Sequence, residues 1–456
     1  MAEVLRSVGL DVGTTSTQMV LSELTVENRA SGFAVPELEI TDRKILYKSD
    51  IHFTPLKTES LVDGEKLREL VQREYTEAGI RRDAVDTGAI IITGETSRKE
   101  NAREVLAALS EFAGDFVVAT AGPDLESVLA AKGAGAVDHS RRTGKTVLHM
   151  DIGGGTSNLA LIRDGKIVET GCLNVGGRLI KLDALGRILY VSPVLEGIWD
   201  GALGQTADEA CLKQLALLLN EALEMAAGLR PASELLTRLT TAETKPLPLA
   251  PAEEGVVLSF SGGVADCIAH SVPWQEFGDL GPLLGQVIRG GRLCQGPYVL
   301  GTETIRATVI GAGCHSAQLS GSTVYYQNVQ LPLKNVPVVE LDTVQQQQIP
   351  QVLPRLLDQQ EGACVIAMPG LSAPGYREVA AFARQIGGVM QGRDVLLCMH
   401  QDMAKALGQS LAAQMGPHAR ILCIDRVKVG QDSYLDIGAP VGTALPVVVK
   451  TLVMGS

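Results

Sequence analysis

Short apolar runs broken by glycine-rich turns mark much of the chain, and two stretches repeat one pattern. Each has an apolar run, an aspartate, an apolar residue, a glycine and small hydroxyl residues, followed by a second apolar run. The first stretch spans residues 7–21 and the second spans residues 147–162. Two apolar runs separated by a short turn are typical of antiparallel strands joined as a hairpin. The sequence therefore predicts two related β-hairpins, with 140 positions between Asp11 and Asp151.

The turns of both hairpins suit a polyphosphate ligand. Glycine lets the backbone approach a ligand closely, and loop amides can donate hydrogen bonds to phosphate oxygens. A neighbouring carboxylate can hold a hydrated Mg²⁺ ion. The candidate phosphate-binding residues are Gly13, Thr14, Thr15, Gly153, Gly154, Gly155 and Thr156, and the candidate metal-binding and catalytic residues are Asp11 and Asp151. Either loop alone is explained equally well as an ordinary glycine-rich hairpin, whereas two copies favour a nucleotide held between them.

A third motif follows the hairpins. An apolar strand from Val257 runs into Gly262 and Gly263 and then into a helix. The three ordered motifs together resemble the two phosphate loops and the adenosine loop of the actin, Hsp70 and sugar-kinase ATPase superfamily. The resemblance implies an α/β fold with two actin-like, ribonuclease H-like lobes around ATP or ADP and Mg²⁺. It also implies helices that cross between the lobes at residues 123–136 and 304–313. Glu126 is then a candidate catalytic residue, because Hsp70-like members carry a glutamate there near the metal and the attacking water.

The spacing of apolar residues predicts the remaining elements. We expect strands at residues 45–53 and 89–93, a turn at 94–96, a helix at 98–112, a polar linker at 139–145, a helical region from Gly176 and a helical subdomain over residues 207–239. Beyond residue 319, four apolar runs alternate with three helical patterns, which is typical of a parallel sheet. The predicted domains are an ATPase lobe at 1–138, a second lobe at 139–318, and a C-terminal α/β domain at 319–456 that offers a partner surface.

Composition narrows the class of partner. The chain has 456 residues, a net charge of −12 and no block of Lys or Arg, which argues against nucleic acid or an anionic membrane as a partner. No stretch approaches the roughly 20 apolar residues of a membrane span. The first seven residues are too short and polar for a secretory signal, so we expect a cytoplasmic protein. The eight cysteines are spread singly, which disfavours a zinc site or a disulfide framework, and His149 is expected to be a packed or hydrogen-bonded strand residue.

Four stretches point to one family within this superfamily. They are residues 9–18, residues 92–96, residues 132–136 and the C-terminal α/β unit. Together they resemble the ethanolamine ammonia-lyase reactivating factors over essentially the whole chain. The resemblance implies an ATP-dependent molecular chaperone whose partner is ethanolamine ammonia-lyase. Such a chaperone releases damaged cobalamin so that intact adenosylcobalamin, the cofactor of the lyase, can enter. Association with the ethanolamine-utilisation microcompartment is implied by the family alone.

Two alternatives from other classes stay open. A small-molecule kinase shares the fold but needs a pocket and a general base for its acceptor. An actin-like structural protein is the second alternative. The glycine-rich loop at residues 153–156 is closer to Hsp70-like loops than to kinase loops, which favours the chaperone. The sequence leaves open whether the chain forms a homodimer, whether cobalamin contacts it directly and which surface binds the lyase.

Overall fold

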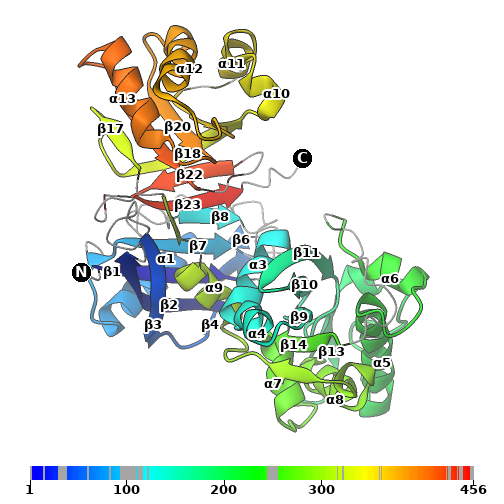
Figure 1. Ribbon diagram of the computed structural model, residues 1–456. Helices are drawn as coiled ribbons and strands as arrows, with labels where there is room; N and C mark the ends of the chain where they lie inside the picture. Colours follow the sequence, from blue (N-terminus) through cyan, green and yellow to red (C-terminus); the bar gives the residue numbers. More distant parts are fainter. Residues whose placement is uncertain are drawn as a thin grey trace.

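A computed structural model describes most of the chain, and three sheets organise it (Figure 1). The described residues are 3–13, 16–28, 38–58, 61–81, 84–92, 109, 117–120, 123–242, 244, 255–315, 317–320, 323–358, 360, 362–427, 429, 433–438, 440 and 445–451. Thr14, Thr15, the turn at 94–96 and nearly all of the predicted helix at 98–112 lie outside these ranges. Within the described ranges, no helix is long and apolar enough to cross a membrane.

The first sheet has the order β3-β2-β1-β7-β8, with β4 beside β2. Strands β1, β2 and β3 are antiparallel, whereas β7 and β8 run parallel to β1. Successive side chains of β7 face opposite sides, so that Ile90 packs against α1 and Ile91 packs against α9. The bounds are β1 Glu3–Val12, β2 Ser16–Asn28, β3 Leu38–Lys48, β4 His52–Phe53, β5 Leu56–Thr58, β6 Leu61–Val62, α1 Gly64–Glu77, β7 Thr87–Ile92 and β8 Val117–Thr120.

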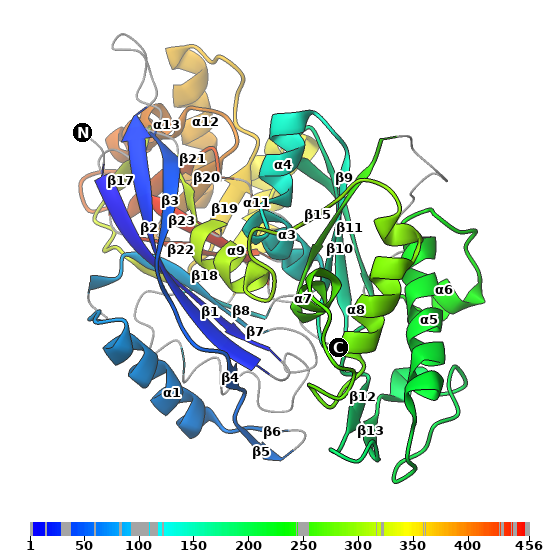
Figure 2. The same ribbon diagram turned by 90° about the horizontal axis from the view of Figure 1, so that it is seen from below.

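The second sheet repeats this topology in the order β11-β10-β9-β14-β15. Three antiparallel strands are again followed by strands parallel to the first of them, and Figure 2 shows the two sheets side by side. The bounds are β9 Val147–Ile152, β10 Ser157–Arg163, β11 Lys166–Leu173, β12 Ile180–Leu182, β13 Ile188–Val191, η3 Pro193–Leu195, α5 Glu209–Ala226, α6 Glu234–Leu239, β14 Val257–Ser261, α7 Gly263–Ala269, α8 Gly281–Gly290, η4 Arg292–Cys294 and β15 Tyr298–Leu300. The repeated topology confirms the predicted fold class of two actin-like lobes.

Two helices join the sheets, and their contact depends on glycine. Helix α3 (Pro123–Gly133) packs against α9 (Ala307–His315), as predicted for the crossing helices. A Cβ atom at Gly133 would lie 1.9 Å from the backbone oxygen of Ala307, and one at Gly311 would lie 2.1 Å from that of Leu129. Because neither position has room for a side chain, the two helix backbones approach each other closely. This close packing of α3 on α9 joins the two sheets.

The C-terminal sheet has eight strands in the order β16-β23-β22-β18-β19-β20-β21-β17. The parallel run β18-β19-β20-β21 and its three long helices match the predicted alternation. The antiparallel strands around that run were not predicted, and β23 lies beside β8 of the first sheet (Figure 1). The bounds are β16 Ala317–Leu319, β17 Tyr325–Gln327, β18 Leu333–Glu340, α10 Thr343–Gln346, α11 Ile349–Leu357, β19 Val365–Met368, α12 Tyr376–Val389, β20 Val395–Met399, α13 Ala404–Met415, β21 Ile421–Asp425, β22 Ser433–Ile437 and β23 Pro446–Thr451.

Three local predictions were wrong. The polar stretch at 139–145 is mostly the helix α4 (Ala136–Thr143), whose charged residues are exposed while Val137 and Ser140 are buried. No helix begins at Gly176, since residues 176–178 brace the second hairpin turn instead. Strand β3 ends at Lys48, so the strand predicted to run to residue 53 is divided between β3 and β4. All eight cysteines are free, and six of them are buried.

Candidate functional site

The two hairpins share one backbone hydrogen bond across their turns. The Gly13 amide donates to the Ser16 carbonyl at 2.9 Å, and the Gly153 amide donates to the Thr156 carbonyl at 2.9 Å. These two amides therefore close their own turns, and the predicted phosphate-binding role of Gly13 and Gly153 stays a prediction. The amides of Gly154 and Gly155 stay candidates for phosphate, and a Cβ atom at Gly155 would meet nothing within 4 Å.

Each aspartate lies one residue before the end of its strand and has a carboxamide as its ladder partner. Asp11 is opposite Gln18 across β1 and β2, and Asp151 is opposite Asn158 across β9 and β10. In both cases the carboxamide comes seven positions after the aspartate, a spacing that the sequence repeats. This repeated spacing is a signal for Gln18 and Asn158 that the predicted motifs did not include.

The start of α9 brings the two hairpins together. The Gln18 Nε2 atom donates to the carbonyl of Ile305 at 3.4 Å, and the Thr308 hydroxyl donates to Asp151 Oδ2 at 3.4 Å. Two residues from separate hairpins thus contact one short segment. The N-terminal end of α9 therefore links the hairpin that carries Asp11 to the hairpin that carries Asp151.

A second segment braces the glycine-rich turn. The amides of Gly177 and Arg178 donate to the carbonyls of Gly153 and Gly154 at 3.0 and 2.6 Å. A Cβ atom at Gly176 would lie 2.3 Å from the Gly154 carbonyl oxygen, so only glycine allows this approach. Sequence reasoning missed this brace because it assigned Gly176 to a helix start.

The predicted adenosine loop also packs on the second hairpin. Strand β14 runs into Gly262, which has φ = 85°, and helix α7 begins at Gly263, as the sequence predicted. A Cβ atom at Gly262 would lie 2.3 Å from the Ile152 carbonyl oxygen. The positive φ and this close approach both require glycine. Gly262 and Gly263 therefore lie directly beside the strand that carries Asp151.

Asp151 is buried, and two hydroxyl groups hold its carboxylate. Ser261 donates to Oδ1 and Thr308 to Oδ2. Burial raises the pKa of Asp151 to about 6, and the hydrogen bonds from Ser261 and Thr308 only partly oppose that rise. Burial makes the ionised form of this carboxyl group costly, and a cation beside it would stabilise that form. Asp151 therefore stays a candidate metal-binding carboxylate.

His149 supports Asp151 through Ser261. The imidazole is fully buried, with Nδ1 3.0 Å from the Ser259 hydroxyl and Nε2 3.0 Å from the Ser261 hydroxyl. Burial lowers the pKa of His149 to about 3, so the ring is neutral. Because Ser261 donates its proton to Asp151, it must accept from Nε2, and Ser259 then donates to Nδ1. The expectation of a hydrogen-bonded strand histidine is confirmed.

Glu126 reaches the same hairpin from α3. Its side chain is buried, and Oε2 accepts a hydrogen bond from Asn158 Nδ2 at 2.8 Å. Asn158 is the ladder partner of Asp151, so Glu126 lies one side chain away from that aspartate. The structure thus brings Glu126, Asp151 and the glycine-rich turn together.

The residues at the junction fit a bound Mg²⁺–nucleotide. Among the described residues, three buried polar atoms near the start of α9 and the second hairpin have no hydrogen-bond partner: Gln18 Oε1, Asn158 Oδ1 and Arg306 Nε. Buried polar atoms are normally paired, so such atoms indicate a polar ligand or water. No group of three or more His, Cys, Asp or Glu in the described ranges has metal-binding geometry. Two carboxylates on separate loops suit Mg²⁺, which keeps several water ligands and takes others from phosphate.

Comparison with known proteins finds one family and two relatives that match nearly the whole chain. The family described as "Ethanolamine utilisation protein EutA" matches residues 3–455. The chain is 39% identical over 474 aligned positions to the ethanolamine ammonia-lyase reactivase EutA of Salmonella typhimurium, covering 99% of each chain. The reactivase EutA of Escherichia coli K12 gives the same identity and coverage.

One solved structure that matches part of the chain is the PPX-GPPA enzyme of Aquifex aeolicus. It is 14% identical with a TM-score of 0.42, and the match covers 68% of this chain and 99% of that one. The family match over nearly all residues, together with 39% identity over the full length of two relatives, decides the assignment. The chain belongs to the ethanolamine utilisation protein EutA family.

Proposed function

We propose that this protein is an ATP-dependent chaperone that reactivates ethanolamine ammonia-lyase. In this proposal it releases damaged cobalamin from the lyase so that intact adenosylcobalamin can enter. The observation that carries the proposal is the 39% identity, over 99% of both chains, to two proteins named ethanolamine ammonia-lyase reactivase. No observation on the site favours the kinase or the actin-like structural protein.

Mg²⁺ and ATP or ADP bind between the two hairpin loops in this proposal. Asp11 and Asp151 hold the hydrated metal, and the loops around them hold the phosphates. The phosphate-binding set is Gly13, Thr14, Thr15, Gly153, Gly154, Gly155 and Thr156, and Gly262 and Gly263 contact the adenosine. Glu126 lies next to Asn158 and orients the attacking water for ATP hydrolysis. The metal supplies charge stabilisation for phosphoryl transfer.

Nucleotide binding is coupled to the partner through movement of the lobes. The two loops belong to separate sheets that are joined by the α3–α9 crossing, so a ligand held by both loops favours the closed arrangement. This protein can drive release of cobalamin only if it binds one conformation of the lyase more tightly than the other. Shifting the lyase from 1:99 to 99:1 requires about 5.5 kcal/mol. An interface of standard size can supply that difference.

The domain roles and the location follow from the same proposal. Residues 1–138 and 139–318 act as the two ATPase lobes, and residues 319–456 present a surface to the lyase. The protein acts in the cytoplasm, in association with the ethanolamine-utilisation microcompartment. Analytical sedimentation would show whether the protein is a homodimer in solution.

A reconstituted assay tests the proposal. Lyase inactivated by bound damaged cobalamin is mixed with the protein, ATP, Mg²⁺ and fresh adenosylcobalamin, and ammonia release is followed. Wild-type protein should restore activity with ATP, and Asp11→Ala and Asp151→Ala should restore little. Equal recovery with and without ATP, or recovery by both variants equal to that by wild-type protein, would overturn the role of the two loops. Recovery that requires a small phosphate acceptor would instead point to a kinase.

A further inference from the structure

The side chain of Arg178 lies along the glycine-rich turn of the second hairpin. Its own amide donates to the Gly154 carbonyl at 2.6 Å. A Cβ atom at Gly154 would lie 3.5 Å from Cβ and Cδ of Arg178 and 3.7 Å from Cγ, so the aliphatic part of the arginine covers this glycine. The guanidinium group follows directly after Cδ. It is therefore held beside the turn whose amides are the candidate phosphate donors.

Asp279 fixes the position of this guanidinium group. Arg178 Nε donates to Asp279 Oδ2 at 3.2 Å, and the side chain of Asp279 is only 8% exposed. Asp279 Oδ1 accepts from the amide of Gly281 at 2.8 Å, at the start of α8. The Leu280 amide donates to the Gly177 carbonyl at 2.7 Å, so the same segment also holds the backbone next to Arg178. Arg178 is thus fixed through both its backbone and its Nε atom.

The Nη donors of Arg178 stay available to a ligand. A guanidinium group carries N–H donors on Nε and on both Nη atoms, in a planar fork. Asp279 takes the donor on Nε, and within the described residues neither Nη atom donates a hydrogen bond. The side chain of Arg178 is 33% exposed, so a ligand can reach these donors. Because Asp279 pairs with the arginine, Arg178 offers a positioned fork of donors rather than an excess of charge.

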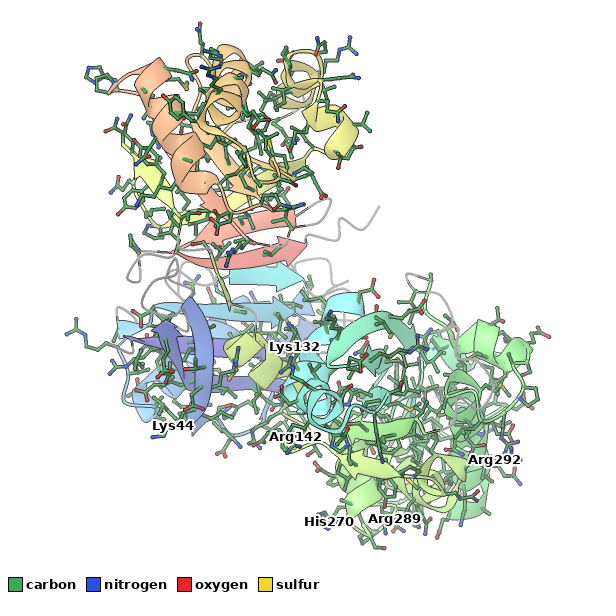
Figure 3. All side chains as sticks on the ribbon, in the orientation of Figure 1. Lys44, Lys132, Arg142, His270, Arg289 and Arg292 are labelled. Atoms are coloured by element: carbon green, nitrogen blue, oxygen red, sulfur yellow. The ribbon has the colours of Figure 1, made fainter. Side chains whose placement is uncertain are left out.

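Another arginine of the second lobe shows the contrast. Arg289 donates from Nε to the Ile268 carbonyl at 2.6 Å and from Nη2 to the Cys267 carbonyl at 3.0 Å. In Figure 3, Arg289 lies near His270, which follows α7. Its contacts with the backbone explain Arg289 as part of the fold, whereas only Nε of the Arg178 side chain has a partner among the described residues.

We propose that the Nη atoms of Arg178 donate to phosphate oxygens of the nucleotide, and that Asp279 is the positioning residue for this contact. A Cβ atom at Gly155 would meet nothing within 4 Å, so the turn next to Arg178 has room for a ligand. Loop amides and an arginine fork both suit phosphate oxygens, and arginine binds them through paired, charge-assisted hydrogen bonds. The inference rests on the proposed nucleotide site and adds to it a side chain that recognises the phosphates.

Titration calorimetry of the full chain with ADP and Mg²⁺ tests the inference. Arg178→Gln should weaken ADP binding about ten- to hundred-fold, because hydrogen bonds to a charged group are lost. Arg178→Lys keeps the charge without the fork and should bind ADP with intermediate affinity. Adenosine carries no phosphate, so Arg178→Gln and wild-type protein should bind it equally. Arg187→Gln removes an exposed arginine from the same lobe and should bind ADP like wild type.

A double variant tests the positioning role of Asp279. Asp279→Asn keeps an oxygen for the Gly281 amide but loses the ion pair, so it should weaken ADP binding by a smaller factor than Arg178→Gln. The double variant should bind ADP no more weakly than Arg178→Gln alone, because Asp279 acts through Arg178. Losses that multiply in the double variant would overturn this role of Asp279.

The outcomes for Arg178 separate this inference from the proposed function. Binding of ADP by Arg178→Gln at wild-type affinity, or an equal loss of ADP and adenosine affinity, would overturn the inference and leave the nucleotide site standing. If wild-type protein binds no ADP, the nucleotide site and the inference both fail. Reactivation of the lyase is measured separately, so loss of this inference alone does not count against the proposed chaperone.

Discussion

Replacing Asp151 with asparagine should stabilise the ligand-free protein and abolish its stabilisation by Mg²⁺ and nucleotide. Asp151 is 8% exposed, and burial raises its pKa from 3.8 to about 6. An aspartate with a raised folded-state pKa favours folding only while it is protonated. Its contribution is complete below pH 4 and is lost as the pH rises through 6. This rise in the pKa of Asp151 lowers the free energy of unfolding of the wild-type protein by about 3 kcal/mol at high pH. An asparagine side chain is neutral at every pH and avoids this loss.

Calorimetry in EDTA at pH 5 and pH 7.5 measures this difference. At about 2–4 °C per kcal/mol for a lobe of this size, Asp151→Asn should melt roughly 6–12 °C above wild type at pH 7.5. The gap should narrow at pH 5. Asparagine keeps the contacts because Ser261 can still donate to its oxygen and Thr308 can accept from its amide. A variant that melts at or below the wild-type temperature at pH 7.5, or a gap independent of pH, would refute the reasoning.

Four further predictions concern nucleotide binding, the Gly176 brace, the glycine-rich turn at Gly155 and the helix crossing. Nucleotide with Mg²⁺ at 100 times its dissociation constant should stabilise wild type by about 2.7 kcal/mol, and a thermal shift that survives in Asp11→Ala would contradict the site. Gly176→Ala should destabilise the ligand-free protein by about 1–3 kcal/mol, because its Cβ atom would meet the Gly154 carbonyl at 2.3 Å. Gly155→Ala, which has open space, should leave stability unchanged but weaken nucleotide binding, as calorimetric titration would show. Gly133→Ala should cost about 3 kcal/mol or more in chemical denaturation, and a neutral result would show that α3 and α9 can separate.

Local patterns in the sequence predicted the elements that carry the site. The Asp11 and Asp151 hairpins, the strand into Gly262 and Gly263, and the crossing helices were all visible as short apolar runs next to glycine. Contacts between distant segments were not visible. Thr308 reaches Asp151 across 157 positions, and Ser261 reaches it across 110, so no local pattern marks either residue.

Two kinds of error have simple physical causes. Polar residues on a short amphipathic helix resemble a linker, which is why α4 was predicted to be irregular. Glycine in a tight approach resembles glycine at a helix start, which is why Gly176 was misassigned. The antiparallel strands β22 and β23 of the C-terminal sheet were missed as well, although residues 433–437 and 446–451 are rich in β-branched and aromatic residues.

Release of damaged cobalamin from the lyase tests the central claim most directly. Inactivated lyase that carries bound cobalamin is mixed with the protein, and free cobalamin is separated by filtration and measured by its absorbance. With wild-type protein, ATP and Mg²⁺ should speed release well beyond the rate without nucleotide, and Asp11→Ala and Asp151→Ala should show the rate without nucleotide. Release at the same rate with and without ATP, or release by the two variants as fast as by wild-type protein with ATP, would contradict a reactivation driven by nucleotide between these loops.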